Sequence, residues 1–103
     1  MTETSHAVRA VRLRPEDTVA VLTRSVKKGE PVVVSGPGAP LEISAAEDIP
    51  GYHKLALSAA RIGDRPLRNG MVIGVFTAET EAGGWVHIHN LASVFSTGRH
   101  EGG

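Results

Sequence analysis

Two histidines alternate with apolar residues in the segment Trp85-Val-His-Ile-His-Asn90. The alternation predicts a strand in which Val86 and Ile88 face the core while Trp85, His87 and His89 share the opposite face. Residues two apart on a strand lie roughly 6.5 to 7 Å apart at Cα, so both rings could converge on one metal ion or one anionic ligand. Imidazole also titrates close to neutral pH, which suits proton transfer. A solvated strand face would produce the same pattern without any chemistry.

A third histidine stands beside a lysine where another apolar segment begins. His53 and Lys54 follow Pro50-Gly51-Tyr52 and precede Leu55 and Leu57. If the two leucines face the core, His53 shares their face and Lys54 takes the opposite one. A lysine and a histidine close together suit the binding of a carboxylate or the abstraction of a proton. A solvated strand entrance is the alternative interpretation.

Three arginines, Arg61, Arg65 and Arg68, form a basic cluster around Gly63 and Pro66. The sequence Arg68-Asn-Gly70 predicts a hairpin turn that could bind a carboxylate. Clusters of this kind are also common on solvated surfaces.

Several kinds of chemistry lack support in the sequence. The segment Ser35-Gly-Pro-Gly38 has the wrong spacing for a phosphate-binding loop, and no serine stands in a nucleophile elbow. With three Asp in the chain, a hydrolytic triad or a paired-carboxylate site has little to draw on. Catalytic pockets usually occupy roughly 300 to 1,000 Å³, so a chain of this size is expected to hold only part of an active site.

The composition predicts one small domain. The chain has 103 residues, 11 Lys and Arg, 11 Asp and Glu, and no Cys. A balanced charge argues against nucleic acids and anionic membranes as partners, and no apolar segment approaches the ~20 residues of a membrane span. The absence of cysteine and of a secretory signal at the N-terminus favours a cytoplasmic protein.

The elements that must position these residues are predicted to be short strands. Gly and Pro interrupt every long amphipathic pattern, and glycines recur three or four residues ahead of apolar positions, as in frequent turns. The predicted strands span 18–23, 31–35, 41–44, 54–58, 71–77 and 85–89. At most one helical turn is expected, at 44–48. The prediction is an all-β domain over 13–95, with flexible tails at 1–12 and 96–103.

Four segments together resemble the SAF domain of the altronate and galactarate dehydratases, the UxaA-like family. They are Arg14-Pro-Glu-Asp-Thr-Val-Ala-Val21, Ile49-Pro-Gly-Tyr-His-Lys-Leu-Ala-Leu57, Arg68-Asn-Gly-Met-Val-Ile-Gly74 and Gly83-Gly-Trp-Val-His-Ile-His-Asn-Leu91. The resemblance covers about residues 13 to 92 and implies a compact β-clip fold. It further implies a part in a metal-dependent β-elimination on a hydroxy acid.

Carried over position by position, the resemblance implies a set of site residues. They are His53, Lys54, His87 and His89 as catalytic residues, Arg68, Asn69 and Asn90 as substrate-binding residues, and His87 and His89 as metal ligands. The expected cofactor is a divalent metal, iron(II) in the first place, which could be shared with a large subunit. The chain departs from the family pattern at Arg14, at Arg68 and Asn69, and at Trp85, where the family commonly has His, Lys-Tyr and His.

The expected function is that of a small subunit of a sugar-acid dehydratase, inactive without a large catalytic subunit. Lys54 or Arg68 would hold the substrate carboxylate while His87 and His89 face the cleft. One alternative is the small subunit of an enzyme similar to the sulfolactate sulfo-lyases, which expel sulfite. Another is a non-catalytic module that binds acids or carbohydrates. Self-association into a homo-oligomer is a further expectation.

Overall fold

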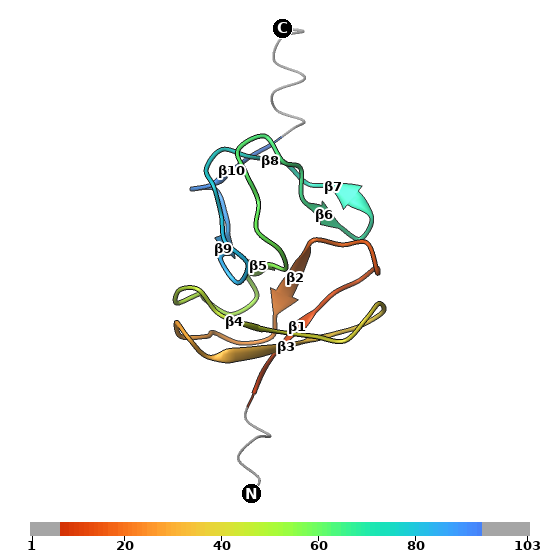
Figure 1. The fold of residues 1–103 in the computed structure, drawn as a ribbon, viewed down its shortest axis with the longest axis vertical. Coiled ribbons are helices and arrows are strands. Elements are labelled where there is room, and N and C mark those ends of the chain that lie inside the picture. The colour runs from red at the N-terminus through yellow and green to blue at the C-terminus, as the bar shows by residue number, and fades with distance from the viewer. Residues whose placement is uncertain (1–6, 94–103) are drawn as a thin grey trace, which may run out of the picture.

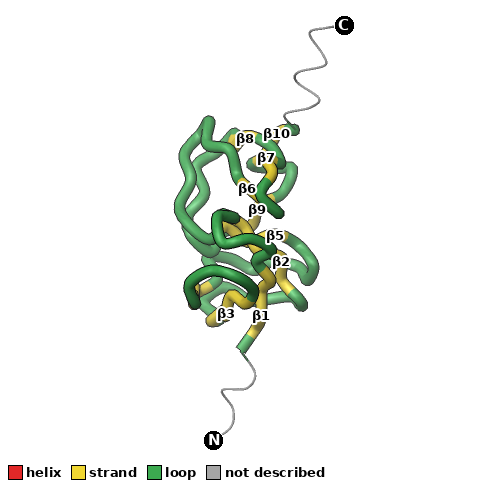
Figure 2. The backbone as a smooth tube through the Cα atoms, turned by 90° about the vertical axis from the view of Figure 1, so that its right-hand side faces the viewer, coloured by secondary structure: helices red, strands yellow, loops and turns green. Residues whose placement is uncertain are grey.

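A computed structural model describes residues 7–93, so the tail predicted at 96–103 lies outside the described residues. Within 7–93 the chain forms strands and loops without a helix, and therefore has no helix that could cross a membrane (Figures 1 and 2). The strands are β1 (Val8–Val11), β2 (Val19–Leu22), β3 (Pro31–Ser35), β4 (Leu41–Ser44), β5 (Lys54–Ala56), β6 (Leu67–Arg68), β7 (Met71–Val72), β8 (Val75–Phe76), β9 (Trp85–Val86) and β10 (Leu91–Ala92). This architecture confirms the small all-β fold.

Strand β1 lies in the interior of a six-stranded sheet of order β4-β3-β1-β2-β5-β9. It pairs in parallel with β3, where Val8 lies opposite Val32, and antiparallel with β2, where Ala10 lies opposite Leu22. All four of these residues are buried. The prediction that residues 1–12 form a flexible tail is therefore wrong for β1. Its alternation of buried and exposed residues extends over only four positions, too few to distinguish a strand from a tail by sequence.

Two clusters of buried apolar side chains form the core. The larger contains Val8, Ala10, Ala20, Leu22, Val26, Val32, Val34, Ala45, Ile49 and Leu55, and the smaller contains Val19, Ala56, Phe76 and Val86. Strand β5 supplies Leu55 to the first cluster and Ala56 to the second, because neighbouring residues of a strand face opposite sides. Trp85, which pairs with Leu55, packs against the larger cluster.

Four turns share one arrangement, in which a basic residue is followed three positions later by Asp, Glu or Asn. The backbone N–H of the first residue donates to the side chain of the last, whose own N–H donates back to the first carbonyl. The turns are Arg14–Asp17, Lys27–Glu30, Arg61–Asp64 and His87–Asn90. Gly29 and Gly63 occupy the third position of two of them with φ of 89° and 95°, which glycine adopts without a Cβ penalty. This arrangement explains part of the glycine spacing in the sequence.

Two predicted elements differ from the structure. The strand expected at 71–77 is divided into β7 and β8 by Ile73 and Gly74. The helical turn considered at 44–48 does not form, because the Glu47 carboxylate accepts a hydrogen bond from the Trp85 N–H across the sheet instead. The backbone N–H of Ala46 likewise donates to the Gly83 carbonyl. The segment is therefore held in a bend by partners distant in sequence.

Candidate functional site

The edge of the six-stranded sheet brings three of the predicted site residues together. Strands β5 and β9 pair antiparallel, with Lys54 opposite Val86. His53 immediately precedes β5 and His87 immediately follows β9, so the same register places the two histidines opposite each other. Their ring centroids are 4.8 Å apart. Three residues at one end of two short strands thus form the nucleus of the site.

The Trp85 indole lies at the centre of this histidine cluster, which we define as His53, Trp85, His87 and His89. Its ring centroid is 5.5 Å from that of His53, 5.4 Å from that of His87 and 5.2 Å from that of His89. The His87 ring is stacked on the indole, with 8° between the planes. The indole Nε1–H donates to His53 Nδ1 at 3.1 Å. Sequence analysis placed Trp85 on the face of the two histidines and noted it as a departure from the family pattern, but did not select it as a site residue.

The segment 85–89 was predicted to be one strand, and this is wrong beyond Val86. His87 to Asn90 form a turn, and the Ile88 side chain is 82% exposed rather than packed in the core. Val86 is buried as predicted. The physical reason is Asn90, whose side-chain carbonyl accepts the His87 N–H at 2.9 Å and so ends the ladder. His87 and His89 are brought together because both pack against the Trp85 indole, and not because they alternate along a strand.

Asn90 is buried, and its amide is used within the chain. Its Nδ2 donates to Thr80 Oγ1 at 2.9 Å and to the Trp85 carbonyl at 2.8 Å, while its Oδ1 accepts from His87. A buried amide with both donors satisfied has little capacity left for a ligand. The side chain of Asn90 therefore holds the turn beneath the histidine cluster, and the substrate contact expected from the sequence stays a prediction.

The electrostatics of the cluster favour a neutral His87. Partial burial lowers the pKa of His87 below its ordinary value of 6.5, and electrostatic interaction with the neighbouring His53, His89 and Lys54 lowers it further. Lys54 contributes to this shift, although alternation along β5 places its side chain on the face opposite that of Leu55. A neutral imidazole at physiological pH can accept a proton.

The predicted substrate-binding residues Arg68 and Asn69 lie elsewhere in the fold. They belong to the β6–β7 hairpin, which is on the opposite side of β2 from β9 in Figure 1. Asn69 has φ of 58° and Gly70 has φ of 75°, as an Asn-Gly hairpin turn requires. The Arg68 Nε is buried and has no hydrogen-bond partner among residues 7–93. The structure therefore does not bring these two residues into the histidine cluster.

The hairpin is organised by a residue that sequence analysis did not select. The buried Asp17 carboxylate accepts the backbone N–H of Arg14 at 3.1 Å, of Asn69 at 2.8 Å and of Gly70 at 2.9 Å. Burial by itself raises the pKa of Asp17, but these N–H groups and that of Leu13 together lower it by more, so that the net pKa falls below 3.8. The signal in the sequence was the Arg-x-x-Asp spacing, which recurs in the turn Arg61–Asp64.

A complete metal centre is not formed within the described chain. Among residues 7–93 no three His, Asp or Glu side chains are arranged to hold one ion. Within the histidine cluster, His53 Nδ1 accepts the indole N–H, so a neutral His53 ring carries its proton on Nε2 and has no free lone pair for a metal. His87 and His89 are the remaining imidazoles, and two ligands are fewer than the three or four that protein metal sites usually supply.

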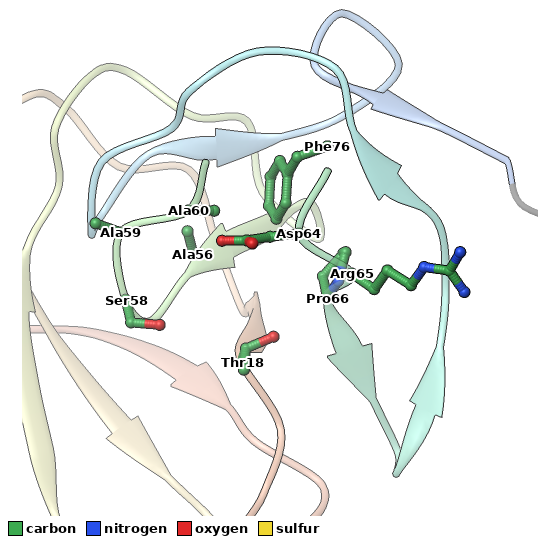
Figure 3. A pocket seen from close by; sticks show the side chains of 9 residues that line it. All are labelled: Thr18, Ala56, Ser58, Ala59, Ala60, Asp64, Arg65, Pro66 and Phe76. Carbon is green, nitrogen blue, oxygen red and sulfur yellow. The ribbon is translucent and has the colours of Figure 1, made fainter. Parts of the chain in front are cut away.

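A separate pocket of about 280 Å³ lies next to the start of β2 (Figure 3). It is lined by Thr18, Ala56, Ser58, Ala59, Ala60, Asp64, Arg65, Pro66 and Phe76. Figure 3 shows the Arg65 guanidinium directed away from the rest of the lining. Asp64 is the one carboxylate of the lining and no imidazole contributes, so this pocket lacks the acid–base groups that the histidine cluster provides.

Comparisons with known proteins agree with the resemblance found in the sequence. Residues 8–94 match the family described as the altronate/galactarate dehydratase SAF domain. The (2R)-sulfolactate sulfo-lyase subunit alpha of Paracoccus pantotrophus is 38% identical over 58 residues, which are 56% of this chain and 87% of that protein. Altronate dehydratase of Bacillus subtilis (strain 168) is 28% identical over 86 residues, which are 84% of this chain but only 16% of that enzyme. The chain therefore belongs to the SAF domain family of the altronate and galactarate dehydratases.

Proposed function

We propose that this chain is the small subunit of a lyase that acts on a sugar acid or a similar hydroxy acid together with a larger catalytic subunit. The observation that carries the proposal is the packing of three imidazoles around Trp85 in a chain of this family. The match over most of a protein named subunit alpha supports a separate small subunit. The match to only 16% of altronate dehydratase supports a partner that carries most of the machinery.

The proposed chemistry is a β-elimination. A base removes the proton from the carbon next to the carboxylate, the released electron pair forms the double bond, and the bond to the β leaving group breaks. His87 is the proposed base, since its lowered pKa leaves the ring neutral and able to take that proton. His89 is exposed beside it, where a substrate can reach it. Lys54, whose charge acts on His87, is the proposed partner of the substrate carboxylate.

The proposed divalent metal, iron(II) in the first place, would be completed by the large subunit. Residues 7–93 hold no group of three possible ligands, so this chain would contribute His89 alone where His87 is the base, and at most His87 with His89 where the large subunit supplies the base. Bound at such a shared site, the metal would supply Lewis acidity toward an oxygen of the substrate. The proposal that the chain is inactive alone follows from this incompleteness.

A second leaving group is favoured by one comparison. Identity to the sulfolactate sulfo-lyase subunit alpha is 38%, against 28% to altronate dehydratase. The second candidate is therefore elimination of sulfite from a sulfonated hydroxy acid by the same residues. Assays of one reconstituted complex with altronate, galactarate and (2R)-sulfolactate distinguish the two candidates, because the products are water in one case and sulfite in the other.

The test is turnover by the chain alone and by the chain co-purified with its large subunit. We expect activity only in the complex, with a loss of about 100-fold or more for His87→Ala and for His89→Ala, the usual scale for removal of an acid or base. Lys27→Ala is the matched control, since Lys27 occupies in its own turn the position that His87 has in 87–90. Full activity in both histidine variants would show that the cluster is only a solvated surface. Activity of the chain alone would show that its site is complete, and a complex inactive on all three acids would favour a binding module.

A further inference from the structure

We propose that Trp85 is a positioning residue that gives two histidines of the cluster different roles. It fixes His53 as a hydrogen-bond donor and holds the His87 ring flat against the indole. The inference rests on the proposed function for its consequence in turnover, and on the geometry of the cluster for its structural part. Nothing in the sequence pattern of alternating histidines required such a role for the tryptophan.

The direction of the hydrogen bond between Trp85 and His53 is set by chemistry. An indole N–H is a donor only, so His53 Nδ1 must be the acceptor in the 3.1 Å contact. A neutral imidazole with an accepting Nδ1 carries its proton on Nε2. His53 is therefore presented to a ligand as an N–H donor, the form that binds an oxygen of a carboxylate or a leaving group. Ligation of a metal or abstraction of a proton through the same Nε2 would require loss of the indole bond.

His87 contacts the face of the same indole and, unlike His53, accepts no hydrogen bond from it. Stacking at 5.4 Å with 8° between the planes fixes the ring orientation without a hydrogen bond from the indole N–H, which is given to His53. Both ring nitrogens of His87 are thus left unrestrained by Trp85. Trp85 thereby fixes His53 in the tautomer that donates from Nε2, and leaves His87 able to change its tautomer during the reaction.

The backbone keeps Trp85 in place independently of the rings. Its N–H donates to the Glu47 carboxylate at 3.0 Å and its carbonyl accepts from Asn90 at 2.8 Å. It also pairs with Leu55 across β5 and packs against the larger core cluster. An indole anchored on both sides can impose orientation on the imidazoles that pack against it, which distinguishes positioning from incidental contact.

The structural part is tested by nitrogen NMR on the full-length chain labelled with ¹⁵N, at a pH above neutrality. The chain has a single Trp, so its indole resonance is unambiguous. We expect a scalar coupling across the hydrogen bond from this indole nitrogen to one imidazole nitrogen, lost in His53→Ala, and a His53 ring that is wholly in the Nε2–H tautomer. Because the wild-type chain is measured, the test does not depend on a variant that folds. Absence of the coupling, or a mixed tautomer, would overturn the inference.

The catalytic part is tested with Trp85→Phe in the reconstituted complex. Phe keeps an aromatic face for His87 but has no N–H for His53, so we expect kcat to fall about 10-fold, as for loss of a residue that orients a catalytic group, with KM changed less than 2-fold. Phe76→Leu, in the smaller core cluster, is the control for a purely structural change and should leave kcat of the assembled complex unchanged. An unchanged kcat in Trp85→Phe overturns the positioning role while leaving the proposed function intact. If the wild-type complex is inactive on all three acids, the proposed function fails and the coupling alone decides the inference.

Discussion

The Asp17 carboxylate is the buried charge on which the Arg14 turn and the β6–β7 hairpin both depend. Its two oxygens accept three backbone N–H groups from segments more than fifty residues apart. The Asp17→Asn variant keeps the shape of the side chain but removes the charge and replaces one oxygen by an NH2 group. That group would face N–H donors in the folded protein, which leaves at least one of them unpaired.

The expected cost follows from the contacts. Hydrogen bonds to a charged group contribute about 1.5–3 kcal/mol each, against about 1 kcal/mol for neutral ones, and an unsatisfied buried donor costs a further ~1–3 kcal/mol. Retention of one oxygen offsets part of this loss. We expect Asp17→Asn to lower the free energy of unfolding by about 2–3 kcal/mol at pH 7. For a domain of this size that corresponds to a decrease in Tm of roughly 10–20 °C.

The pH dependence gives a sharper test than a single Tm. Because the folded-state pKa of Asp17 lies below its unfolded value, the stabilisation is complete above the unfolded pKa and is lost as pH falls through the folded pKa. Urea unfolding of the two proteins should therefore show a constant difference in free energy near neutrality. The difference should shrink below the ordinary value of 3.8, as the wild-type carboxyl takes up a proton.

Asp64→Asn is the matched control for this experiment. Asp64 accepts one backbone N–H, that of Arg61, in an equivalent turn, but is exposed. We expect a loss of about 0.5–1 kcal/mol, typical of one solvated turn contact. If Asp17→Asn were no worse than Asp64→Asn, or if its deficit persisted unchanged at low pH, the assignment of a charge-dependent role to Asp17 would be refuted.

Three further changes test other parts of the structure by thermal and urea unfolding. Val86→Ala should cost about 2 kcal/mol through a cavity in the smaller core cluster, and His87→Ala should lower Tm clearly less; the reverse order would place His87 in the core. Asn90→Ala should cost about 2–4 kcal/mol because it removes three internal hydrogen bonds, whereas a near-neutral effect would mean that Asn90 is free for a ligand. Gly83→Ala should destabilise more than Gly63→Ala, since a Cβ at 83 would lie 2.2 Å from the Ser44 carbonyl oxygen while that at 63 meets nothing within 4 Å; equal losses would show that positive φ alone sets the cost.

The fold class could be predicted from sequence because it depends on local features. Short β-branched segments bounded by Gly and Pro placed strands correctly at 31–35 and 41–44, centrally within 18–23, and at the start of 54–58. The errors occur where the conformation of a segment depends on a partner that is distant in the sequence. Strand β1 exists because β2 and β3 flank it, and the bend near Glu47 exists because that carboxylate binds the Trp85 N–H.

The candidate site was predicted only in part, because some of its features are local in the sequence and others depend on distant partners. Residue types and spacing identified His53, His87 and His89, and the structure places all three against Trp85. Alternation assigned the wrong conformation to Ile88 because periodicity does not register the capping of a turn by Asn90. Trp85 was missed as a site residue, since a tryptophan in a strand is ordinarily a packing residue and its N–H partner lies 32 positions earlier.

The separation of the two predicted groups limits which basic residues can serve the histidines. The β6–β7 hairpin is attached at the start of β2, where Leu67 donates to Thr18 Oγ1, whereas the His53 carbonyl accepts the Leu22 N–H at the end of β2. Three residue steps from Val19 to Leu22 span about 10 Å. A three-carbon acid held at the histidine cluster is shorter than this, so under the proposed function it would not reach Arg68 and Asn69. Its carboxylate would then depend on Lys54, or on a cation from the proposed large subunit.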